Sequence, residues 1–184
     1  MFSEIKKISS LLLSVAFSSI GFIASITVTV LAAREVSSNP LFVGFPNAVG
    51  VGGAVLGTRM IYLISKTNSQ LNALAFTFLI GAFGGAIMFY SLIIDSFLLL
   101  LLGAFILGIG QSATLQTRYA ASFVAGTKFK ATALSLAVWF SVFGSVFGPR
   151  MVGSYSNFFE NIFNSDLIVG YVIAFVGMLF AAAS

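Results

Sequence analysis

The feature that most constrains this chain is a series of apolar stretches, each about as long as a bilayer is thick. A helix needs about 20 mostly apolar residues to cross a membrane, and six stretches qualify, with short polar breaks between them. The six predicted helices cover residues 8–33, 41–64, 71–92, 96–125, 131–153 and 167–183. The sequence therefore predicts an all-α, polytopic membrane protein that forms a single six-helix transmembrane bundle over residues 1–184.

Composition supports a lipid environment and argues against several classes of function. Of the residues, 59% are hydrophobic and only 8% are charged, whereas about a quarter of a soluble domain is charged. The basic residues are spread along the chain, so we expect no nucleic-acid partner. The sequence contains no cysteine or histidine, no paired carboxylates, no nucleophile–base arrangement and no phosphate-binding loop. We therefore expect a protein that is not an enzyme, needs no cofactor or metal, and has the lipid bilayer as a partner.

The basic residues in the breaks predict the orientation in the cell membrane, because short cytoplasmic loops are enriched in lysine and arginine. With a cytoplasmic N-terminus, the opposite side holds only Arg34 and Arg150. The cytoplasmic side then holds Lys6, Lys7, Lys66, Lys128 and Lys130. This bias predicts a multi-pass protein with both termini in the cytoplasm.

Both ends of the chain leave an alternative open. The first apolar stretch, residues 8–33, is longer than the 7–15 residues typical of a signal peptide. An uncleaved first helix is therefore favoured over a cleaved signal. The last stretch, residues 167–183, is barely long enough to cross a bilayer, so the sequence is also compatible with a piece of a longer protein.

The six helices divide into two groups of three with similar features. The second helix of each group is rich in glycine, and the first is the richest in polar side chains. With the predicted orientation, the first group enters the membrane from the cytoplasm and the second from outside. This pattern predicts two inverted three-helix repeats, a recurrent plan in secondary transporters.

Arg118 is the sharpest functional signal, because it lies about eight residues from the cytoplasmic end of the predicted fourth helix. A guanidinium stays charged and is costly to bury in a bilayer, so it needs a wet cavity, an anion or another polar helix. Gln111, Thr114 and Arg118 share one helical face. We predict that these three, with Asn47 of the second helix, line a central cavity and bind substrate. In the alternative, Arg118 reaches the lipid headgroups or caps helix ends inside the bundle.

Glycines spaced four residues apart form the second signal, because they let helix backbones approach closely in lipid. Tight packing alone explains them. A functional interpretation is that glycine-lined faces allow helices to rock, and that Pro149 kinks or loosens the outer end of its helix. The predicted packing or conformational residues are Gly53, Gly57, Gly144, Gly148, Pro149 and Gly153.

Hydroxyl side chains form a roughly one-sided row on the predicted first helix. The row consists of Ser14, Ser18, Ser25 and Thr29. Serine and threonine in a membrane helix can donate to the carbonyl one turn earlier. We therefore expect most of this row to be structural.

Parts of the chain resemble the major facilitator superfamily, in particular drug-efflux-like bacterial members. The resemblance is carried by residues 116–122, 131–139 and 144–149, and by residues 44–57 of the second helix. Gly144, Gly148, Pro149 and Gly153 match most of a fifth-helix motif that the family associates with antiporters, with Val152 where another glycine is usual.

Two departures from the family pattern put proton coupling and the cytoplasmic conformational lock in doubt. The family loop Gly-x-x-x-Asp-Arg-x-Gly-Arg-Arg aligns with residues 61–70, where Ser65 replaces the aspartate and Lys66 keeps a charge. The fourth-helix motif Arg-x-x-x-Gly-x-Gly keeps both glycines, but Ala104 replaces the arginine.

The resemblance implies one six-helix half of a secondary active transporter. We expect it to move a small amphipathic or anionic solute by alternating access, together with a second half from a second copy, another chain or a missing segment. The alternative is a non-transporting membrane subunit, derived from a carrier, that serves as an assembly partner in a larger membrane complex.

Overall fold

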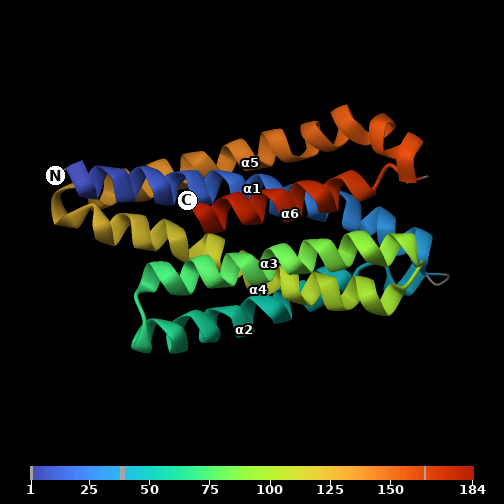
Figure 1. Cartoon of the computed structure of the whole chain (residues 1–184), viewed down its shortest axis with the longest axis horizontal. Coiled ribbons are helices and arrows are strands. Elements are labelled where there is room, and N and C mark those ends of the chain that lie inside the picture. Colours follow the sequence, from blue (N-terminus) through green and yellow to red (C-terminus); the bar gives the residue numbers. More distant parts are fainter. Residues whose placement is uncertain (1, 38–39, 164) are drawn as a thin grey trace.

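The computed structural model describes residues 2–37, 40–163 and 165–184, and the described part of the chain is helical without a strand. It contains α1 (Phe2–Val36), a short 3-10 helix η1 (Pro40–Phe42), α2 (Phe45–Thr67), α3 (Gln70–Ile93), α4 (Phe97–Val124), α5 (Gly126–Phe163) and α6 (Ile168–Ala183). The predicted all-α class is confirmed. The start of α1 and the end of α6 lie toward the same end of the bundle (Figure 1), which we call the N-terminal end.

Five of the described helices, α1 to α5, are long and apolar enough to cross a membrane. The sixth, α6, is apolar but has 16 residues, fewer than the roughly 20 that a perpendicular crossing needs. The chain is therefore a polytopic membrane protein with five helices of spanning length and one shorter apolar helix.

The prediction for the fifth helix, residues 131–153, is too short at both ends. α5 begins at Gly126 and continues through Pro149 to Phe163. Residues 126–130, which we expected to form the polar break before this helix, and most of the break after Gly153 are therefore helical. Hydropathy reports the apolar stretch of a helix, whereas the backbone hydrogen bonds of a helix are internal and let it continue past that stretch.

The turn between α4 and α5 depends on a single glycine. Gly126 has a φ of 67°, in the left-handed region that glycine adopts without a steric penalty. Its position directly after Ala125, the last capping residue of α4, is where helices commonly end with such a glycine. The chain therefore reverses direction here without the five-residue loop that we expected.

The helices pack as two groups of three. α1 packs mainly against α5 and α6, whereas α4 packs mainly against α2 and α3, and Figure 1 shows the two groups side by side. The groups meet where α1 contacts α4 and α3 contacts α6. Buried side chains from both groups form one hydrophobic core, which includes Val28, Phe78, Leu100 and Tyr171.

Glycines bring these helices into backbone contact. A methyl group added at Gly53 of α2 would overlap the carbonyl oxygen of Phe105 in α4, and one added at Gly57 would lie 2.7 Å from the carbonyl oxygen of Ile109. On α5, a methyl group at Gly144 would lie 2.5 Å from Cβ of Ser19. These contacts position α2 against α4 and α5 against α1.

Candidate functional site

A cavity of about 420 Å³ lies between α1, α4 and α5, and we call it the Arg118 cavity. Its lining residues are Ser19, Phe22, Ile23 and Ile26 of α1, Gln111, Thr114, Leu115 and Arg118 of α4, and Val138, Ser141, Val142 and Ser145 of α5. Half of these residues are apolar, and each of the three helices contributes polar residues as well. No acidic side chain is among these residues.

Three of the four predicted substrate-binding residues line this cavity. Gln111, Thr114 and Arg118 follow one another at intervals of three and four residues, so the helical period directs them to one side of α4. Arg118 is half-buried, while the other described basic side chains are exposed. Its Nε atom is buried and has no hydrogen-bond partner among the described residues.

Two buried hydroxyls in the cavity also lack a hydrogen-bond partner among the described residues. They belong to Thr114 and Ser19, each 4% exposed. Other hydroxyls of α4 are satisfied by their own helix: Ser112 donates to the Ile109 carbonyl at 2.6 Å, and Thr117 donates to the Ala113 carbonyl at 2.7 Å. Buried polar groups are normally hydrogen-bonded, so unpaired hydroxyls beside an unpaired guanidinium Nε make this cavity the candidate site.

The cavity lies near the middle of the two helices that face α4. Ser19 is the eighteenth of the 35 residues of α1, and Ser145 is the twentieth of the 38 residues of α5. Arg118 lies closer to the N-terminal end, six residues before the last residue of α4. Its long side chain therefore reaches a cavity at mid-height of α1 and α5.

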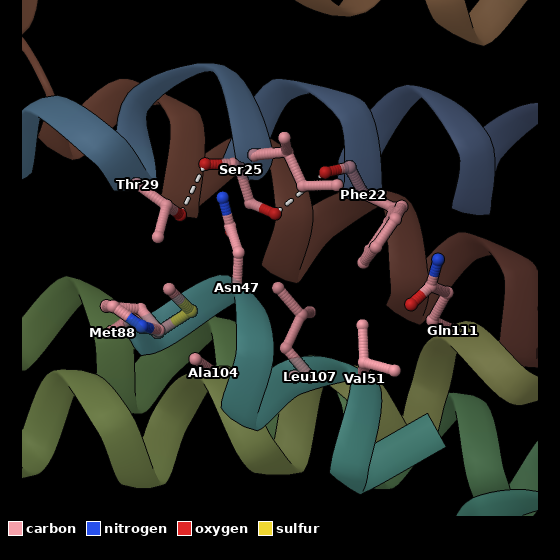
Figure 2. A pocket seen from close by; sticks show the side chains of 12 residues that line it. Phe22, Ser25, Thr29, Asn47, Val51, Met88, Ala104, Leu107 and Gln111 are labelled. Carbon is pink, nitrogen blue, oxygen red and sulfur yellow. Dashed lines mark hydrogen bonds between the residues drawn. The ribbon is translucent and has the colours of Figure 1, made fainter. Parts of the chain in front are cut away.

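A second cavity of about 250 Å³ adjoins the first and contains Asn47, the fourth predicted residue. We call it the Asn47 cavity; α1, α2, α3 and α4 line it (Figure 2). Phe22, Ile26 and Gln111 line both cavities. Figure 2 shows the Asn47 side chain directed from α2 toward α1, and among the described residues the Asn47 and Gln111 amides have no hydrogen-bond partner.

The hydroxyl row of α1 behaves as the sequence predicts. Ser18 donates to the Ser14 carbonyl at 2.7 Å, and Thr29 donates to the Ser25 carbonyl at 2.7 Å. Ser25 donates to the Phe22 carbonyl at 2.8 Å, so its hydroxyl is already paired although it lines the Asn47 cavity. Most of this row is therefore structural.

The predicted packing glycines divide into two sets. Gly53, Gly57 and Gly144 contact neighbouring helices closely, and a methyl group at Gly148 would lie 3.0 Å from the Ile20 carbonyl oxygen. Gly153, by contrast, faces open space, and a methyl group added there would meet no atom within 4 Å. Pro149, which directly follows Gly148, lies inside α5, and this helix continues without interruption.

Sequence reasoning missed Ser19 and the α5 side of the cavity. Ser19 is about 100° around the helix from Ser18, so it falls outside the hydroxyl row that drew attention. Ser141 and Ser145 are scattered among apolar residues of α5. Their spacing of four residues was the available signal, but only the packing of α5 against α1 shows which face of α5 meets the cavity.

Comparison with known proteins shows which transporters the chain is similar to. No family model matches the chain, and no solved structure matches it significantly. The chain is 30% identical over 169 residues to the uncharacterized MFS-type transporter YdeG of Bacillus subtilis, and 30% identical over 176 residues to the uncharacterized MFS-type transporter YddS of the same organism. These matches cover 92% and 96% of the chain, but only 39% and 40% of the relatives.

The two relatives confirm the resemblance that the fourth and fifth helices suggest. Both are named as transporters, and the similarity extends over nearly all of the chain. The chain spans about two fifths of the length of each relative. Over nearly all of its length, the chain is therefore similar to transporters of the major facilitator superfamily, and its own long apolar helices are those of a multi-pass membrane protein.

Proposed function

We propose that the chain forms one half of a secondary active transporter, which moves a small amphipathic or anionic solute across the cell membrane by alternating access. The observation that carries this proposal is the Arg118 cavity, where a half-buried guanidinium faces unpaired polar groups at mid-height of α1 and α5. A charge in such a place is costly without a polar partner. A passing anionic solute supplies that partner.

The packing pattern supports a bundle of six crossings built as two inverted three-helix repeats. Exchanging the two groups converts the contacts of α1 with α5 and α6 into those of α4 with α2 and α3. Glycine contacts of α3 with α4 and of α6 with α1 follow the same exchange: a methyl group at Gly81 of α3 would lie 2.7 Å from Cα of Gly110, and one at Gly177 of α6 would lie 3.2 Å from Cα of Gly21. In this arrangement both termini lie in the cytoplasm.

The least buried helices support a partner for this bundle. In the most apolar stretch of α2, 17% of the residues are buried, and in that of α5 28%, against 50% or more in α1, α3 and α4. α2 and α5 also flank the two cavities. A second six-helix half, from a second copy, another chain or a further segment, would pack along these helices and close the cavities.

Transport in liposomes tests the proposal. The protein, with its second half where that is a separate chain, is reconstituted and assayed with labelled carboxylates, phosphates and zwitterions. We expect flux of at least one anionic solute, which Arg118→Gln abolishes. The matched control is Arg59→Gln, because Arg59 is exposed on α2 and lines neither cavity. Absence of flux for the whole panel would refute a transport function.

A specific observation favours a non-transporting subunit as the second candidate. Ala104, which stands where the family has an arginine, is 6% exposed and lines the Asn47 cavity. No titratable carboxylate is among the described lining residues of either cavity. Arg118→Gln separates the candidates: a carrier would lose flux and keep its assembly, whereas a structural subunit would lose assembly with its membrane complex.

A further inference from the structure

We propose that the ligand of this site is an amphipathic monocarboxylate, whose carboxylate binds Arg118, Thr114 and Ser19 while its apolar body extends toward Asn47. This inference rests on the proposed function, because it names the solute class that the same cavity would receive. It adds Ser19 to the binding residues and assigns separate tasks to the two adjoining cavities.

The charge of the Arg118 cavity fits one negative charge. Arg118 supplies its single formal charge, and no acidic residue lines it. One guanidinium neutralises a monoanion, whereas a dianion would keep one unpaired charge, which is unfavourable wherever that charge is removed from water. The planar guanidinium also matches the geometry of a carboxylate, which can accept two parallel N–H donors.

The unpaired donors fit the remaining lone pairs of that carboxylate. The Arg118 Nε atom and the hydroxyls of Thr114 and Ser19 are buried without hydrogen-bond partners among the described residues, and they come from α4 and α1, which both line the cavity. An ionised carboxylate accepts hydrogen bonds at about four positions. By contrast, the Ser141 hydroxyl on α5 already donates to the Ala137 carbonyl at 2.8 Å, so it has less to offer a ligand.

The apolar walls fit the body of an amphipathic molecule. Phe22 and Ile26 line both cavities, and Ile23, Leu115, Val138 and Val142 are further apolar residues of the Arg118 cavity. Ligand cavities for small organic molecules typically have volumes of about 300–1,000 Å³, and the Arg118 cavity alone lies in this range.

The unpaired amides at the far side fit a second polar group on the ligand. Gln111 stands where the two cavities meet, and Asn47 lies beyond it. Each amide offers both a donor and an acceptor. A hydroxyl or amide at the end opposite the carboxylate would therefore pair there, without requiring another charge.

Direct binding tests the proposal independently of transport. The full chain in phosphatidylcholine nanodiscs is titrated with radiolabelled 3-phenylpropionate, after subtraction of binding to empty nanodiscs. Saturable binding is expected, and the neutral isostere 3-phenylpropionamide should compete at least about 30-fold more weakly, because loss of one partner of a buried charge pair costs about 2 kcal/mol or more. Equal competition by the amide would overturn the proposal.

Variants assign the binding to these residues. Arg118→Gln should weaken binding about 30-fold or more, Arg118→Lys should restore part of it, and Thr114→Val or Ser19→Ala should each weaken it by about tenfold, as expected for a hydrogen bond to a charged group. Ser112→Ala is the matched control, because the Ser112 hydroxyl lines neither cavity and already donates to the Ile109 carbonyl, and it should bind as the unchanged protein does. Unaltered binding by Arg118→Gln, Thr114→Val and Ser19→Ala, with Tm unchanged, would contradict the proposal.

Two further comparisons distinguish this proposal from a lipid-binding site and from the proposed transport function. Nanodiscs that contain phosphatidylglycerol test whether a lipid headgroup occupies the site. Binding of 3-phenylpropionate should persist in them. Complete loss of this binding at a low fraction of phosphatidylglycerol would instead identify a lipid site. A protein that binds the carboxylate but shows no flux of any solute refutes the transport function alone. Flux of a solute without carboxylate binding refutes this inference alone.

Discussion

Thr114 and Thr117 show at the residue scale how the same side chain on one helix acquires two roles. Thr117 is fully buried and its hydroxyl donates to the carbonyl of Ala113. Thr114 is turned toward the Arg118 cavity and its hydroxyl has no partner in the described part of the chain. A buried polar group without a hydrogen bond destabilises a fold, so the Thr114 hydroxyl does not stabilise the ligand-free protein, in keeping with the binding role that we propose for it.

This difference predicts opposite effects of one isosteric substitution. Thr114→Val removes an unpaired hydroxyl and should leave the unfolding free energy of the ligand-free protein unchanged or raise it by about 1 kcal/mol. Thr117→Val removes a formed hydrogen bond and should lower it by about 0.5–1.5 kcal/mol. Thermal unfolding in detergent measures both. A Thr114→Val variant that is the less stable of the two would contradict our view of this hydroxyl.

Glycines act at the element scale by letting whole helices approach. α2 lies so close to α4 that Gly53 leaves no room for a side chain, whereas its neighbour Gly52 faces open space with nothing within 4 Å of an added methyl group. Without a strong hydrophobic force between helices in lipid, such close packing is a main source of their association. The α2–α4 contact therefore depends on particular glycines and not on glycine content.

Adjacent substitutions test this dependence. Gly53→Ala forces a methyl group into the Phe105 backbone and should destabilise the protein by about 1–3 kcal/mol, the usual effect of overpacking. Gly52→Ala, one residue away on the same helix, should be neutral or stabilise by up to about 1 kcal/mol, because alanine favours helix. Unfolding in detergent again gives the comparison. Equal Tm values for the two variants would argue against tight α2–α4 packing.

At the scale of the whole molecule, the turns between helices lie at two opposite ends of the bundle. The turns after α2 and α4 lie toward the N-terminal end of the bundle, and the turn after α3 lies at the opposite end (Figure 1). Lys66 and Lys130 are at the N-terminal end. The Lys66 ammonium group lies over the Tyr62 ring, and the Lys130 ammonium group lies over the Phe123 ring. If basic residues mark the cytoplasmic side, this end of the bundle is cytoplasmic.

Single cysteines test this orientation, because the natural chain has none. Asn68→Cys and Thr127→Cys place a thiol in exposed positions at the N-terminal end, and Ile94→Cys places one in the exposed turn after α3. In intact cells, a membrane-impermeant maleimide should label only Ile94→Cys, and it should label the other two after permeabilisation. Buried Ala24→Cys is the unreactive control. The reverse labelling pattern would invert the topology.

The sequence predicted the fold class and most helix positions, since long apolar stretches leave few alternatives in a membrane. It also predicted that Gln111, Thr114 and Arg118 share a surface, since the helical period alone requires this. It failed at the bounds of α5, because hydropathy measures the apolar stretch and not the helix. It missed Ser19, because nothing in the sequence distinguishes this serine from the other serines of the same helix.

The amino-acid sequence by itself determined that this chain is helical, that it lies in a membrane, and that one polar face of α4 carries a charge. Only the tertiary structure decided what that face meets. Periodicity within a helix assigns residues to faces, but the rotation of one helix against another depends on contacts between distant segments, here the glycines that bring α2 to α4 and α5 to α1. Those contacts turn the unpaired hydroxyls of Thr114 and Ser19 toward the same cavity as Arg118.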